Sequence, residues 1–173
     1  MNAVKLLKED HRQVAALFEQ FDGADDDDKG EIAGRVCRML TVHAQIEEEL
    51  LYPAARGALE EQDAGLVDEA TVEHASVKDL VGQIESSDSS DELFDAKVKV
   101  LGEYVTHHVK EEEGELFPKL EKSEVDLAAL GAQLETRKTE LTGAMDRGQA
   151  GNGPSNPRKS PHRAKGSHRG AIR

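Results

Sequence analysis

Apolar residues recur at steps of three and four along four stretches of the chain, which is the spacing of the buried face of a helix. The stretches cover about 4–21, 31–51, 65–85 and 89–116. No stretch sustains the alternation of apolar and polar residues that a strand would show. Because short connections between long helices favour antiparallel neighbours, the pattern predicts an all-α, up-down-up-down four-helix bundle.

Local signals predict where these helices begin and end. Proline breaks the hydrogen-bond ladder of a helix, so the second and fourth helices are expected to end near Pro53 and Pro118. The acidic run "DGADDDDKG" after the first helix is expected to form a solvated loop. Ser89 and Glu92 have the spacing of a capping box for the fourth helix.

An additional C-terminal helix is predicted over about 124–147, with Ser123 as its N-cap. The remaining residues, "GQAGNGPSNPRKSPHRAKGSHRGAIR", are rich in Gly, Pro, Ser and basic side chains and contain almost nothing apolar. Such a composition is typical of a disordered segment. We therefore divide the chain into a helical domain over 1–147 and a disordered basic tail over 148–173.

Charge is divided between these two parts. The tail contains six of the 22 basic side chains and none of the 35 acidic ones, which leaves residues 1–147 with a net charge of −19. An acidic domain argues against nucleic acid as the main partner. The six charges of the tail would allow only weak, salt-sensitive contact with nucleic acid or with the acidic domain.

Composition also bears on the compartment. Cys37 is the single cysteine, so no disulfide can form within the chain, which fits a reducing compartment. No run approaches the roughly 20 apolar residues of a membrane span, and the first residues lack the apolar core of a signal peptide. We expect a cytoplasmic protein with no membrane partner.

Six polar residues interrupt the apolar faces of the four long helices. One histidine replaces an apolar residue in the first helix and another does so in the third, whereas the second and fourth helices each contribute a histidine and a glutamate. A separation of four residues places that histidine and glutamate on one face. The six residues are His11, His43, Glu47, His74, His108 and Glu112.

This pattern occurs twice along the chain. "HAQIEEELLYP" and "HVKEEEGELFP" share the frame H-x-x-x-E-E-x-x-L-[YF]-P at an offset of 65 residues. "EDHRQVAALF" and "VEHASVKDLV" align at an offset of 63 residues. The two repeats predict approximate twofold symmetry between the first and second pairs of helices.

Taken together, these residues predict a site for two metal ions. A carboxylate in an apolar core is unfavourable unless it is paired or binds a metal. Imidazole and carboxylate together suit iron, manganese or zinc, and the two carboxylates can bridge two ions that the histidines cap. A single core histidine is more often a hydrogen-bonded core residue, and one H-x-x-x-E pair is more often a surface pair. The joint pattern favours the metal site.

On these residues, the chain resembles the hemerythrin-like domains of the HHE cation-binding type over about 1–120. The resemblance implies a four-helix bundle that holds a non-haem di-iron centre. Its two iron ions would be bridged by Glu47 and Glu112, together with an oxo or hydroxo bridge. It also implies a small-molecule ligand, O2, H2O2 or NO, at an open coordination position.

The sequence departs from the oxygen carriers of this family in two places. The carriers have a further histidine one turn after the third-helix histidine, where this chain has Lys78. That position is left to water, to substrate or to a nearby side chain, the candidates being Glu73, Glu113 and His107. Tyr52 and Tyr104 also lie near enough along their helices to hydrogen-bond at the site.

The second departure concerns the carboxylate of the fourth helix. The carriers place it five residues after the histidine, which here would be Glu113. We prefer Glu112, because five residues rotate a side chain about 140° away from His108 around the helix axis.

The expected function is that of a di-iron protein that binds or reacts with oxygen, peroxide or nitric oxide, with peroxide removal as its enzymatic form. Alternatives are a non-enzymatic iron or gas sensor, an iron-storage protein and a structural zinc site. The sequence leaves open the physiological ligand, catalytic turnover and the oligomeric state.

Overall fold

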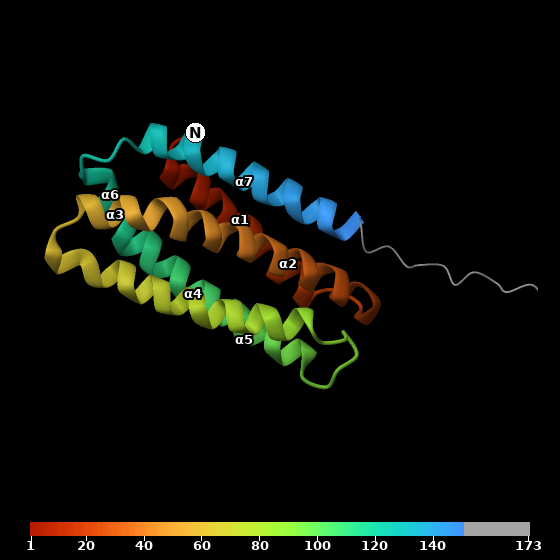
Figure 1. Cartoon of the computed structure of the whole chain (residues 1–173). Coiled ribbons are helices and arrows are strands. Elements are labelled where there is room, and N and C mark those ends of the chain that lie inside the picture. Colours follow the sequence, from red (N-terminus) through yellow and green to blue (C-terminus); the bar gives the residue numbers. More distant parts are fainter. Residues whose placement is uncertain (151–173) are drawn as a thin grey trace, which may run out of the picture.

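The computed structural model describes residues 1–150, and every regular element in this part of the chain is a helix (Figure 1). The four long helices are α1 (Ala3–Asp22), α2 (Asp26–Ile46), α4 (Ala64–Glu85) and α5 (Phe94–Glu111). α1 packs on α2 and α4 packs on α5, while contacts of α2 with α4 and of α1 with α5 close the ring. The predicted all-α four-helix bundle is confirmed.

Two apolar clusters fill the bundle. One cluster includes Leu7, Leu51 and Phe117, and the other includes Val36 and Leu101, all of them fully buried. Along α1, α2 and α4, the predicted histidine lies between a residue of one cluster and a residue of the other. On the fourth long helix, His108 lies between Val105 of the second cluster and Leu116 of the first, which follows the end of α5. The polar residues therefore form a layer across the middle of an otherwise apolar core.

The second and fourth helices do not end at their prolines, so this prediction is wrong. Each passes through one π turn into a short α-helix, in the order η1 (Glu47–Leu51), α3 (Tyr52–Ala58) and η3 (Glu112–Leu116), α6 (Phe117–Lys122). The backbone N–H groups of Tyr52 and Phe117 donate to carbonyls five residues back. The wider turn accommodates the proline that follows, whose ring would clash with the carbonyl four residues back in a regular helix.

Two predicted helix starts are also wrong. α2 begins inside the acidic run that was expected to be a loop, with Asp26, Asp27 and Asp28 in its first turn. Carboxylates in a first turn are favourable because they lie at the positive end of the helix dipole. α5 has Leu93 at its N-cap, so Ser89 does not cap it.

The additional C-terminal helix is present as α7 (Leu127–Ala150), and a short 3₁₀ turn, η2 (Glu61–Asp63), precedes α4. Asp126 rather than Ser123 caps α7, because its carboxylate accepts from the N–H groups of Ala128 and Ala129 at 3.1 and 2.9 Å. α7 continues beyond Arg147, and the rest of the predicted tail lies outside the described residues. No helix within 1–150 is long and apolar enough to cross a membrane.

α7 lies outside the four-helix ring, across α1 and α2 (Figure 1). Leu130 and Leu134 anchor its first half in the core. Gly131 faces the start of the chain, where a Cβ atom would lie 2.4 Å from the carbonyl oxygen of Met1 and 2.7 Å from the amide nitrogen of Ala3. Backbone atoms cannot yield as a side chain can, so this approach requires glycine.

Gly131→Ala is therefore expected to destabilise the fold by about 1–3 kcal/mol, the typical effect of overpacking. The better helix propensity of alanine, about 1 kcal/mol, would offset only part of this. Gly82→Ala is the matched control, because a Cβ atom at this exposed α4 position meets nothing within 4 Å. It should stabilise by up to about 1 kcal/mol. Urea unfolding of both variants measures the effects, and a stabilised Gly131→Ala protein would contradict the close approach.

Candidate metal centre

The six residues predicted from the sequence all lie in the polar layer at the middle of the bundle. The four histidines come from four different helices, α1, α2, α4 and α5, and the two glutamates open the π turns η1 and η3. All six side chains are buried, with exposed fractions of 0 to 7%. The fold thus brings together the whole predicted set.

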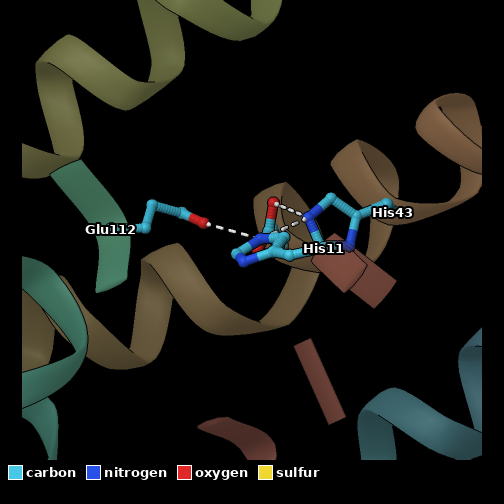
Figure 2. Close-up of side chains that lie close together, drawn as sticks. His11, His43 and Glu112 are labelled. Carbon is cyan, nitrogen blue, oxygen red and sulfur yellow. Dashed lines mark hydrogen bonds and ion pairs between the residues drawn. The ribbon is translucent and has the colours of Figure 1, made fainter. Parts of the chain in front are cut away.

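The histidines form two pairs. The Nε2 atoms of His11 and His43 lie 3.2 Å apart, and those of His74 and His108 lie 3.1 Å apart. Figure 2 shows the first pair, with the carboxylate of Glu112 directed toward His11. Each pair thus presents two imidazole nitrogens to one point in the core.

Glu47 lies between the two pairs. Its Oε2 atom is 3.3 Å from Nε2 of His43, one turn earlier in the chain, and 3.4 Å from Nε2 of His74. One carboxylate oxygen therefore faces a histidine of each pair. Glu47 is also the first residue of the π turn η1.

Glu112 occupies the corresponding place on the other side. Its Oε2 atom is 3.4 Å from Nε2 of His11 and 3.5 Å from Nε2 of His108. Its Oε1 atom accepts a hydrogen bond from the Tyr52 hydroxyl at 3.1 Å. Glu113 does not face the pairs, since it contacts the outer nitrogen of His11, Nδ1, at 2.8 Å.

Three buried carboxylate oxygens have no hydrogen-bond partner, namely both oxygens of Glu47 and Oε2 of Glu112. A buried polar atom left in this way costs about 1–3 kcal/mol, and more when it is charged. The potential ligand atoms fall into two overlapping groups that share Glu47, each with its atoms within 4.8 Å of one another. Unpartnered oxygens between imidazole nitrogens fit a cation, and the shared carboxylate fits two cations side by side.

When no cation is bound, protonation of His11 and Glu47 compensates part of the negative charge of the buried carboxylates. Burial alone would lower the pKa of His11, but Glu112 and Glu47 raise it to about 9. Burial, reinforced by the charge of Glu112, raises the pKa of Glu47 to about 7. Burial alone would raise the pKa of Glu112, but the neighbouring imidazoles of His11 and His108 lower it to about 2. A protonated His11 thus balances an ionised Glu112.

A second set of carboxylates surrounds the histidines, and the spacing of the six core residues did not predict it. Each outer nitrogen, Nδ1, faces an acidic side chain at 2.7 to 3.5 Å, in the pairs His11–Glu113, His43–Asp10, His74–Glu48 and His108–Glu73. An Nδ1–H group that donates to a carboxylate leaves the Nε2 lone pair free for a metal and fixes the orientation of the ring.

The outer carboxylates were visible in the sequence as neighbours of the six residues. Asp10 and Glu73 directly precede a histidine, and Glu48 and Glu113 directly follow a glutamate. Each of the two sequence repeats therefore contains these acidic neighbours at equivalent positions. A search for acids conserved between the two repeats could have found them.

The side chains proposed for the place of the missing histidine lie elsewhere. Lys78, which stands at that position in the sequence, pairs with Glu48 at 2.6 Å on the surface. Glu73 and Glu113 contact the outer nitrogens of His108 and His11. His107 lies near Glu73 and Glu111 with 63% of its surface exposed. The hydroxyl of Tyr52 lies beside the second pair, 3.1 Å from Nε2 of His74. Tyr104, by contrast, is largely exposed.

A small cavity of about 20 Å³ adjoins the four histidines on the side of the core toward the second apolar cluster. Its other walls are mostly aliphatic, formed by Val14, Leu40, Val77, Val105 and Val109. A volume of this size can hold about one water-sized molecule.

Two histidine pairs around shared carboxylates in the core of a helical bundle are typical of a metal-binding protein, and this is the class to which the fold and the site point. The chain belongs to the family of the hemerythrin HHE cation binding domain, whose profile matches residues 2–120. The resemblance found in the sequence is thereby confirmed, and α7 lies beyond the matched residues.

Two known proteins are similar to the chain. It is 35% identical over 118 residues to a DNA nickase of Nostoc sp. (strain PCC 7120), a match that covers 68% of this chain and 33% of that protein. The chain thus spans about a third of the length of this relative. The crystal structure of a hemerythrin HHE cation binding domain-containing protein from Mycobacterium kansasii has a TM-score of 0.74 at 21% identity, covering 90% of this chain and 96% of that chain. The second match shows the shared fold.

Proposed function

We propose that the protein binds two iron ions in its core and reacts there with oxygen-derived species, peroxide above all. His11 and His43 would hold one ion, His74 and His108 the other, and Glu47 and Glu112 would bridge them. The supporting observation is a pair of buried carboxylate oxygens without a hydrogen-bond partner, Oε2 of Glu47 and Oε2 of Glu112, each of which faces a histidine of both pairs. Iron supplies the redox chemistry when it is bound, and the protein supplies geometry and exclusion of water.

The cavity beside the histidines favours a small, weakly polar molecule as the reactant. Its volume of about 20 Å³ and its aliphatic walls suit O2, NO or H2O2 and exclude larger substrates. The polar groups that meet it are the histidines and the buried Asp10, so an entering molecule is directed toward the histidine pairs.

Tyr52 is placed to hold a proton at the centre. Its hydroxyl lies between Glu112 Oε1 and His74 Nε2, at 3.1 Å from each. Burial, followed by the charges of Glu47 and Glu112, raises the pKa of Tyr52 well above its usual range, so the phenol stays protonated and donates. In the sequence repeat, the equivalent residue of the other half is Phe117, which has no hydroxyl.

Tyr52→Phe is expected to retain two iron ions per chain but to slow peroxide turnover by about 100-fold, a typical contribution of one proton donor. Stopped-flow measurement of peroxide decay, with iron content determined on the same sample, separates the two effects. Phe117→Tyr in the other half serves as a comparison that adds a hydroxyl. Unchanged turnover in Tyr52→Phe would remove the proton role from Tyr52.

The proposed function is tested on protein purified anaerobically without added metal. We expect about two iron ions per chain, an absorption band of an oxygen-bridged iron pair after exposure to air, and oxygen evolution from peroxide faster than with the same concentration of free iron. Zinc in place of iron would contradict the proposal. Two iron ions with no turnover would instead favour the non-enzymatic alternatives, an iron or gas sensor or an iron-storage protein.

A second candidate function is metal-dependent nicking of DNA, which the 35% identity to a DNA nickase favours. The net charge of −19 on residues 1–147 opposes it, so DNA contact would depend on the six basic side chains of 148–173. The test incubates supercoiled plasmid with the iron-loaded full chain and with a chain ending at Ala150, with and without oxygen. No conversion to the open circle under any condition would exclude this candidate.

A further inference from the structure

The second half of α7 contacts the bundle through the partly buried side chain of Leu141 and through charged side chains. Beyond Leu134, none of the described α7 side chains is fully buried. Arg137 pairs with Glu49, with its Nε atom 2.7 Å from Oε2, and Lys138 pairs with Asp10 of α1. Of these two ion pairs, the one with Asp10 lies next to the candidate metal centre, because Asp10 also faces His43.

Asp10 connects α7 to the histidines. Its side chain is only 2% exposed, and its two oxygens face different partners, Oδ1 the ammonium of Lys138 and Oδ2 the Nδ1 atom of His43 at 3.5 Å. Lys138 is about one third exposed. A buried carboxylate takes the orientation that satisfies its charged partner, so the lysine decides where the second oxygen points.

His43 is the member of the first pair that depends on this contact. Its Nδ1 atom faces Asp10 at 3.5 Å, whereas the Nδ1 atom of His11 has the closer carboxylate of Glu113 at 2.8 Å. An imidazole whose outer nitrogen loses its partner can rotate and change tautomer, and it then binds a metal less well.

We propose that Lys138 is a positioning residue for the metal centre. By fixing Asp10, it holds the ring of His43 with Nε2 toward His11, so the docking of α7 sets the affinity of the His11–His43 pair for its ion. The proposal rests on the metal site of the proposed function and adds to it a helix that lies outside the family match.

The experiment titrates metal-free full chain with Fe²⁺ anaerobically by calorimetry, using a wild-type protein and five variants. Lys138→Met should weaken one of the two binding steps by about tenfold, the lower end of the range for groups that support metal ligands. Lys138→Arg keeps a cation and should stay within about threefold of wild type. Lys119→Met, which breaks a comparable surface ion pair with Asp63 at 2.9 Å, should bind as wild type does.

The remaining variants form a double-mutant cycle that shows whether Lys138 acts through Asp10. Asp10→Asn should weaken the same step at least as much as Lys138→Met does. Adding Lys138→Met to Asp10→Asn should weaken it little further, because coupled residues are not additive. Circular dichroism of each metal-free variant checks that the helices are intact.

The visible spectrum of Co²⁺-loaded protein provides a readout independent of affinity. Lys138→Met should change the bands of one bound ion and leave those of the other as in wild type. Wild-type affinity in Lys138→Met, or full additivity in the cycle, would overturn the role of Lys138 while leaving the metal site in place. A wild-type protein that binds no Fe²⁺ would instead remove the proposed function, and this inference with it.

Discussion

Replacing Glu47 with glutamine is expected to stabilise the metal-free protein and to weaken the metal-bound one. Both oxygens of Glu47 are buried without hydrogen-bond partners, so the metal-free fold should gain about 1–3 kcal/mol when the charge is removed. The same change removes the carboxylate that faces His43 and His74. The affinity for the second ion should therefore fall by at least about 100-fold, about 2.7 kcal/mol.

The gain in the metal-free protein should depend on pH. Because the folded pKa of Glu47 is about 7, above its ordinary value of 4.5, its ionisation destabilises the fold increasingly as pH rises from 4.5 to 7. Glutamine removes this effect, so the gain should be largest above pH 7 and absent below about pH 4.5.

Urea unfolding at several pH values and calorimetric titration with Fe²⁺ measure the two effects of Glu47→Gln. Glu115→Gln, an exposed glutamate in the other π turn, is the matched control and should change neither quantity. A metal-free Glu47→Gln protein less stable than wild type would mean that Glu47 serves as a structural ion pair rather than as a metal ligand.

Metal binding is expected to raise the thermal stability of the domain by about 15 °C or more. Each ion present at about a thousand times its Kd contributes about 4 kcal/mol, since the unfolded chain cannot hold the six side chains together. For a chain of this size, 1 kcal/mol corresponds to about 2–4 °C in Tm.

Differential scanning calorimetry of chelator-treated protein, with and without Fe²⁺ under nitrogen, measures this shift. A variant carrying both Glu47→Gln and Glu112→Gln should show only a small shift, because it retains the histidines but lacks the carboxylates between them. A wild-type Tm that does not respond to the metal would show that the polar layer is stable by itself.

The sequence predicted the bundle and its polar layer because both depend on local spacing. A histidine in an apolar stripe, or a glutamate four residues after a histidine, is visible within two helical turns. Twofold repetition then related His11 to His74 and His43 to His108 without any knowledge of distances. Family membership confirmed the interpretation of the pattern as a cation-binding domain.

The remaining features depend on contacts between distant segments. Lys138 looks like an ordinary surface lysine until α7 is folded across α1, where it meets Asp10. The helix ends expected at Pro53 and Pro118 were wrong because a proline limits only its own turn, and the π turn ahead of it removes the clash. Gly131 is required by the start of the chain, which lies far from it in sequence.

Tyr52 and Phe117 are equivalent in the sequence repeat, but their rings meet the centre differently. The tyrosine presents its hydroxyl to His74, while the phenylalanine ring stacks on His11 with centroids 5.8 Å apart and planes 4° from parallel. The six polar residues of the core follow the internal duplication, whereas the flanking aromatic residues break it. The two histidine pairs thus have chemically different surroundings, so two ions bound as proposed would not be equivalent and should differ in affinity.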